Sequence, residues 1–135
     1  MKATELMQGD IVLYEYKGER FTAVVREIYN ESVLVEEIAL VYEPVEIPMQ
    51  DIYSIPLTPE ILEKNGFDFI KNDNTKSVWN GWWIYEGLEL ATACLNKKDN
   101  WPCFINIYDS NIKCEYVHQL QHALRLCGIE KEIAL

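Results

Sequence analysis

The chain has 135 residues, of which 49 % are hydrophobic, and it carries a formal net charge of -10 at pH 7. This length suits one domain or two small halves, and the apolar content excludes a disordered chain. The basic residues are scattered, with Lys97 and Lys98 as their only adjacent pair, so neither a nucleic-acid backbone nor an anionic membrane surface is an expected partner.

Short strands and turns fill the first 57 residues. The opening ten residues lack the apolar core of a signal peptide. Strands are predicted at 11–16, 20–29, 32–37, 45–48 and 55–57, with a turn at 17–19 and one helical turn at 49–54. Because Pro44 and Pro48 each remove a ladder donor, the fourth strand is expected at an edge. The pattern predicts a small, curled antiparallel barrel.

Residues 58–135 combine two helices with a second set of strands. Thr58 is a competent N-cap and Pro59 is favoured at the first helical position, so a helix is predicted from Thr58 to Asn65. Strands are expected at 67–70, 77–86, 88–95 and 101–108, with a polar loop at 96–100 and a turn at 109–111. A terminal helix at 116–127 completes the pattern.

Acidic residues gather between Arg26 and Lys64, where no other Lys or Arg occurs. The simplest interpretation is a solvated face that keeps the protein in solution, and the sharper one is a patch that docks a basic protein partner or imitates nucleic acid. The candidate partner-binding residues in this stretch are Glu31, Glu36, Glu43 and Glu46.

A tryptophan cluster occupies the strand predicted at 77–86. On a regular strand Trp79 and Trp83 share one face, and Trp82 lies on the other. Aromatic bulk on both faces favours a core role. Residual exposure of Trp82 would leave a binding role open, as a stacking platform for sugar rings or bases or as a contact for a partner.

His118 and His122 are four residues apart, the spacing that lets two imidazoles face one metal ion. The residue after the first histidine is Gln119, which cannot act as the general base of a zinc protease. The helical wheel places Val117, Leu120, Ala123, Leu124 and Cys127 on the apolar face and both histidines on the opposite face. We therefore expect a solvated histidine face and no metal.

Four cysteines, at positions 94, 103, 114 and 127, form no Cys-x-x-Cys pair. This spacing does not favour zinc, and buried reduced thiols are expected rather than disulfides. The sequence contains no glycine-rich phosphate loop and no Gly-x-Ser-x-Gly motif. No catalytic residue, cofactor or metal site is predicted, and an enzyme is not expected.

Three segments, Met1–Val12, Ile55–Phe67 and Tyr116–Gln121, resemble a group of small uncharacterised proteins of Bacteroidales gut bacteria and their phages or mobile elements. The resemblance implies a bacterial or phage origin and a shared fold, and it transfers no catalytic residue. The opening segment is also similar to small SH3-like barrels. The expected fold class is therefore α+β, with a small SH3-like antiparallel β-barrel at 1–57. An antiparallel β-sheet with two helices, the longer one C-terminal, follows at 58–135, and the two parts are expected to pack as one unit.

The leading hypothesis is a non-enzymatic protein-interaction module in the cytoplasm, whose acidic face and exposed aromatic surface meet another protein or a second copy of the chain. One alternative is a regulator linked to nucleic acid through acidic mimicry or a DNA-binding partner. The least favoured alternative is a metal-binding protein built on His118 and His122.

Overall fold

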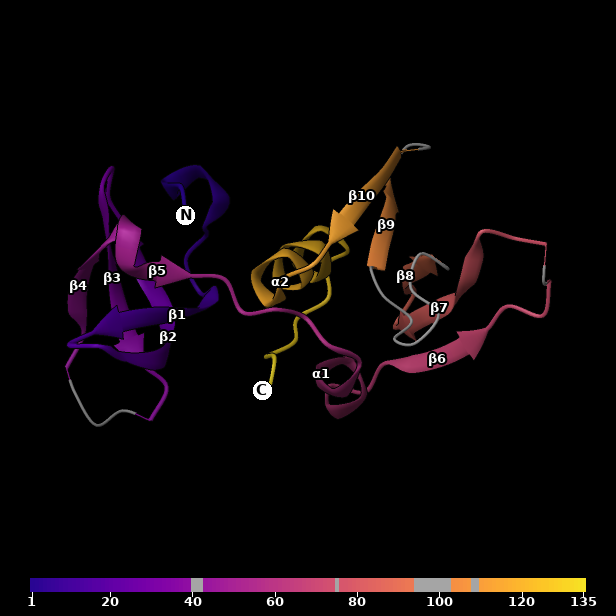
Figure 1. The fold of residues 1–135 in the computed structure, drawn as a ribbon, viewed down its shortest axis with the longest axis horizontal. Helices are drawn as coiled ribbons and strands as arrows, with labels where there is room; N and C mark the ends of the chain where they lie inside the picture. The colour runs from indigo at the N-terminus through magenta and orange to yellow at the C-terminus, as the bar shows by residue number, and fades with distance from the viewer. Residues whose placement is uncertain (40–42, 75, 94–102, 108–109) are drawn as a thin grey trace. The chain divides into compact units, whose positions relative to one another are not determined.

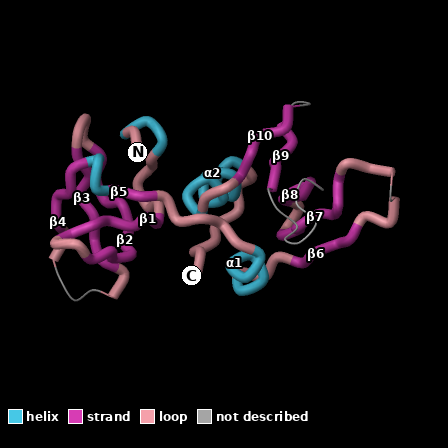
Figure 2. The backbone as a smooth tube through the Cα atoms, viewed as in Figure 1, coloured by secondary structure: helices cyan, strands magenta, loops and turns pink. Residues whose placement is uncertain are grey.

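The computed structural model describes residues 1–39, 43–74, 76–93, 103–107 and 110–135 (Figure 1). The chain divides into two compact units, Met1–Ile55 and Pro56–Leu135. Antiparallel strands are the main regular structure of both units, and helical segments are few (Figure 2). In this coarse form the predicted α+β class, with two sheets and the longer helix at the C-terminal end, is confirmed.

The first unit is a curled sheet of strands in the order β4-β3-β2-β1-β5. Its strands are β1 (Ile11–Tyr16), β2 (Glu19–Ile28), β3 (Ser32–Glu37), β4 (Val45–Pro48) and β5 (Ile52–Tyr53). A 3-10 turn, η1 (Ala3–Glu5), precedes β1, and a second, η2 (Met49–Asp51), connects β4 to β5. The predicted strand at 55–57 is wrong, because the strand that closes the sheet is β5, whose Ile52 pairs with Tyr14 of β1.

The turn between β1 and β2 fixes the register of the first unit. Lys17 and Gly18 both have positive φ, 51° and 79°, as a tight two-residue hairpin turn requires. Tyr16 consequently pairs with Glu19, and Tyr14 pairs with Phe21. The predicted three-residue turn at 17–19 would have set Tyr16 opposite a different residue.

Alternate residues of these strands point into one core. Val12, Val25, Val33 and Val35 are fully buried. Their β-branched side chains suit the pleated surface of a sheet, and each alternates along its strand with a more exposed neighbour. The inner face of the curled sheet is therefore apolar at its centre, and Tyr14 and Phe21 continue this core toward the hairpin turn.

The second unit contains a sheet in the order β10-β9-β8-β7-β6 and two helices. Its elements are α1 (Pro59–Lys64), β6 (Asp68–Lys71), β7 (Trp79–Tyr85), β8 (Leu88–Ala93), β9 (Cys103–Ile107), β10 (Ser110–Cys114) and α2 (Val117–Leu126). The predicted turn at 109–111 is wrong at its end, because Ser110 and Asn111 begin β10 and pair with β9. The predicted loop at 96–100 and Trp101 lie outside the described residues.

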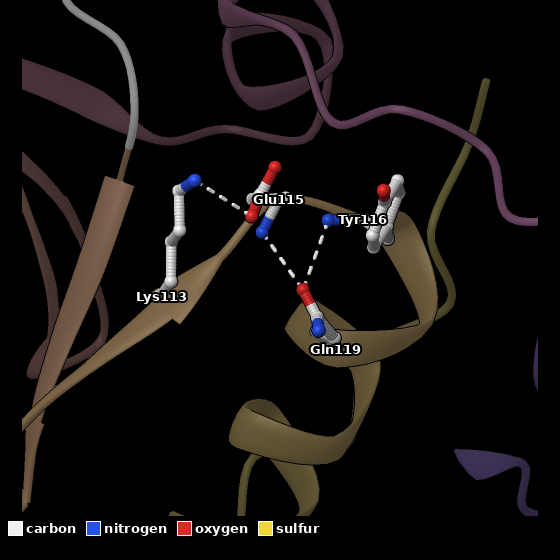
Figure 3. Close-up of polar contacts among 4 residues, drawn as sticks. All are labelled: Lys113, Glu115, Tyr116 and Gln119. Atoms are coloured by element: carbon white, nitrogen blue, oxygen red, sulfur yellow. Dashed lines mark hydrogen bonds and ion pairs between the residues drawn. The ribbon is translucent and has the colours of Figure 1, made fainter.

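Local side-chain chemistry sets where both helices begin. The Thr58 hydroxyl accepts a hydrogen bond from the Ile61 amide at 3.3 Å, which confirms the predicted N-cap of α1. At α2 the Gln119 side-chain oxygen accepts from the main-chain amides of Glu115 and Tyr116, at 2.8 Å and 3.2 Å (Figure 3). Gln119 thus caps the start of α2, because its side chain accepts from main-chain amides that have no partner within the helix.

The C-terminal segment is held against α1 by Asn65. This residue is 3 % exposed, and its amide nitrogen donates to the carbonyls of Ile61 and Ala134, both at 2.7 Å. Its side-chain oxygen accepts from the Ala134 amide at 2.8 Å. Two residues from the chain end, Ile133 is buried. Asn65 was predicted only to end the helix, yet it also ties the last residues into the core.

We predict that Asn65→Ala destabilises the protein by about 2–4 kcal/mol, because it removes three hydrogen bonds and leaves buried main-chain groups without partners. The measurement is urea unfolding, combined with hydrogen exchange at the Ala134 amide, which should lose its protection. Asn74→Ala is the control, since Asn74 lies in an exposed turn. Equal stability of the two variants would contradict the anchoring role.

Candidate interaction surfaces

The predicted partner-binding glutamates all lie in the first unit, but two of them are already engaged. Glu36 of β3 and Glu46 of β4 alternate with core residues and point away from the core. The Arg26 guanidinium donates to Glu36 at 2.7 Å, and the Ser32 hydroxyl donates to Glu46. These two carboxylates therefore belong to the outer surface of the sheet, where screening by water makes each contact weak.

The other two glutamates lie at opposite ends of the sheet. Glu31 is in the turn between β2 and β3, and it lines a shallow hollow with Met1 and Lys2. Glu43 precedes β4, at the end of the sheet that carries the Lys17–Gly18 turn. The four residues consequently do not form a single acidic patch.

Glu43 borders a groove that we call the hairpin groove. Its volume is about 460 Å³, and it is lined by Tyr14, Tyr16, Lys17, Glu19, Phe21, Glu43 and Val45. The Tyr14 and Phe21 rings stack across β1 and β2 with centroids 5.2 Å apart. Tyr16 and Glu19 form the next pair on the same face of the hairpin. The groove thus combines a wall of aromatic rings with a carboxylate rim.

Charges at the groove favour a cation. Glu19 and Glu43 are exposed on its rim. The Lys17 ammonium lies 5.2 Å from the centroid of the Tyr16 ring, a distance typical of a cation–π contact. Tyr16 itself is 52 % exposed, so an incoming group can still reach this ring. Lys17, in the turn between β1 and β2, therefore already places one positive charge at the groove.

A further carboxylate, Glu37, lies on the same inner face. It pairs with Ala23, which is two residues beyond Phe21 on β2 and therefore points to the same side. The Oε2 atom of Glu37 is buried, and no described residue donates a hydrogen bond to it. A buried carboxylate oxygen is costly until a donor or a cation reaches it.

Sequence reasoning missed most of the groove. A signal was present, because Tyr14 and Tyr16 are two residues apart before the turn and Phe21 follows it, which places all three rings on one face in a two-residue hairpin. Because the predicted turn had three residues, the pairing of Tyr14 with Phe21 was not expected. Glu37 was counted among the acids, but its inward direction depends on the ladder with β2.

The tryptophans divide between the two faces of the second sheet. Trp83 is 3 % exposed and packs against Phe69, with ring centroids 5.1 Å apart. A bulge between Trp79 and Gly81 shifts the register, so Trp79 pairs with Ala93 and its ring meets Phe104, at 5.7 Å. The prediction that Trp79 and Trp83 share a face is therefore wrong.

Trp82 is half-buried, and its role as a contact for a partner stays a prediction. It pairs with Ala91, whose other neighbour in the sheet is Phe104, so Trp82 lies on the same face as Trp79 and Phe104. All of these side chains are half-buried, and Ile70 opposite Trp82 is 51 % exposed. This face is aromatic and partly open, and its described charged residues, Asp68, Glu89 and Lys113, are of both signs.

The prediction of a solvated histidine face is wrong for His118. Its side chain is 4 % exposed, whereas His122 is half-buried. The His118 ring stacks on Tyr116 at 5.8 Å and meets the edge of His122 at 5.7 Å. Burial on α2 therefore reaches beyond the predicted apolar stripe and includes both His118 and Gln121. The rings of Tyr116 and His122, which are close to His118 along the chain, help to shield it.

We expect His118→Ala to destabilise the protein by about 1–3 kcal/mol, since it empties a buried, ring-lined position. His122→Ala is the matched control in the same helix and should cost less, because this side chain is half-buried. Urea unfolding of both variants tests the order. A larger loss for His122→Ala would reverse the assignment of buried and exposed positions.

The described cysteines differ in their surroundings. Cys114 is fully buried, and burial raises the pKa of its thiol to about 12. Cys127, predicted on the apolar face of the helix, is exposed instead and lies one residue beyond the end of α2. Within the described residues, no three His, Cys, Asp or Glu side chains cluster closely enough to hold a metal ion.

Labelling with a maleimide at pH 7.5 should modify Cys127 in the folded protein and leave Cys114 untouched. A thiol with a pKa of about 12 presents almost no thiolate at that pH, and the fold shields it from the reagent. Peptide mapping by mass spectrometry measures both sites separately, and labelling in urea is the control. Rapid labelling of Cys114 without denaturant would contradict its burial.

No protein-family model, curated protein or solved structure matches the chain. Among the described residues, no helix has the length and apolar character required to cross a membrane.

Proposed function

We propose that the chain is a non-enzymatic protein-interaction module acting in the cytoplasm, and that its first unit receives a basic segment of a protein partner. We also propose that this unit is an SH3-like barrel. The strand order β4-β3-β2-β1-β5, with a single helical turn before the last strand, supports that assignment.

The observation that carries this function is the hairpin groove. Aromatic side chains are enriched where proteins recognise one another, because they present a large, rigid contact area. Tyr16 and Phe21 supply that area, and Glu19 and Glu43 add the negative rim. The net charge of -10 extends the same preference to longer range, since it accelerates the approach of a positively charged partner.

The arrangement of carboxylates does not favour the alternative of acidic mimicry. Imitating a nucleic acid requires exposed carboxylates in a row, whereas Glu31 and Glu43 lie at opposite ends of the sheet. Glu36 is in addition paired with Arg26 on the outer surface.

Selection from a random peptide library tests the proposed function. The immobilised chain should enrich peptides that contain lysine or arginine, relative to an unrelated protein of equal net charge. Binding of the enriched peptides should weaken as salt rises from 0.1 M to 1 M, because the Debye length falls from about 10 Å to about 3 Å. A selection without enrichment, or one that yields only neutral or acidic peptides, would contradict the proposal.

A further inference from the structure

We infer that the hairpin groove is a binding site for one lysine side chain of the partner, whose ammonium group takes the place of the Lys17 ammonium on the Tyr16 ring. This inference rests on the proposed function and names the group that the site recognises. A volume of about 460 Å³ falls within the range of about 300–1,000 Å³ that is usual for small-ligand sites.

The walls of the groove match a long, cationic side chain. A lysine carries an apolar stem and a charged tip, and such side chains lay the stem along apolar surface. The stacked Tyr14 and Phe21 rings and Val45 supply the apolar surface. Glu19 and Glu43 supply the counter-charge at the rim. A neutral side chain would gain the apolar contacts without attraction from the two carboxylates, and an acidic one would be repelled by them.

Lys17 shows that an ammonium group fits this ring. Its position in the turn makes it a resident competitor, because its Nζ atom lies 5.2 Å from the Tyr16 centroid before any ligand arrives. A ligand lysine must displace it, and the displaced ammonium can return to water because Lys17 is exposed. Removal of the Lys17 charge is therefore expected to strengthen binding.

Glu37 supplies an independent indication of a cation on this face. Its buried Oε2 accepts no hydrogen bond from the described residues, although Glu37 faces the same side as Phe21. Glu37 as a whole is half-buried, but a buried carboxylate oxygen without a donor lowers the stability of the free protein, and a bound cation offsets that cost. Neutralising Glu37 is consequently expected to raise the thermal midpoint of the free protein and to weaken the binding of a cation.

The probe is a blocked Gly-Lys-Gly tripeptide, and the same peptide acetylated on its lysine nitrogen is the neutral control. NMR titration, followed on the ring signals of Tyr16 and Phe21, measures both affinities. Glu43→Gln should weaken the lysine peptide by up to about fivefold, the range for an exposed ion pair. Glu46→Gln changes the net charge equally on the outer surface, and it should leave the affinity within experimental error.

Two further variants complete the test. Lys17→Asn should strengthen the lysine peptide about two- to fivefold, and asparagine tolerates the positive φ of this position, so the turn is kept. Glu37→Gln should weaken the peptide while raising the thermal midpoint. Equal losses in Glu43→Gln and Glu46→Gln would overturn the inference, as would equal binding of the acetylated peptide or a loss of affinity in Lys17→Asn. Basic library peptides that bind with none of these effects would leave the interaction module standing and remove its lysine site.

Discussion

The register of the first hairpin is the constraint on which the rest of the first unit depends. Lys17 and Gly18 close β1 onto β2 with two residues of positive φ, and this turn sets Tyr14 opposite Phe21. Side chains alternate with a period of two, so a slip of one residue would turn the rings to the outer surface and the core valines with them. The same pairing that buries Val12 and Val25 thus also builds the aromatic wall of the groove.

The second unit depends on contacts that are distant in the sequence. Its chain end is held by Asn65, and the buried side of α2 includes His118 and Gln121 as well as the apolar residues. Gly81 shows a similar constraint within the sheet, because a Cβ atom there would lie 2.5 Å from both the Ile70 carbonyl oxygen and the Phe69 ring. Close packing leaves no room for such an atom without displacement of a strand.

Local patterns predicted most elements, and tertiary contacts decided the rest. The Thr58 cap and the alternating valines have signals within a few residues of themselves, and the structure confirms them. The helical turn predicted at 49–54 is confirmed only at Met49–Asp51, because Ile52 and Tyr53 pair as strand β5 instead. β10 was missed because it is a strand through its pairing with β9, and that pairing cannot be read from the residues of β10 alone. The burial of His118 was missed for a related reason, since a helical wheel contains no information about what the rest of the fold packs against the helix. The groove forms only when β1 pairs with β2, so Glu43 is the only one of its lining residues that the sequence predicted as a partner contact.

The functional proposal depends most on one contact, that of a partner's lysine ammonium with Tyr16 within the hairpin groove. The most direct measurement is an isotope-filtered nuclear Overhauser experiment on the complex with the blocked Gly-Lys-Gly peptide. The account predicts contacts from the ε-methylene protons of the lysine to the ring protons of Tyr16 and Phe21, and none to the ring of Trp82. Contacts to Trp82 instead, or contacts spread over many rings without preference, would contradict it.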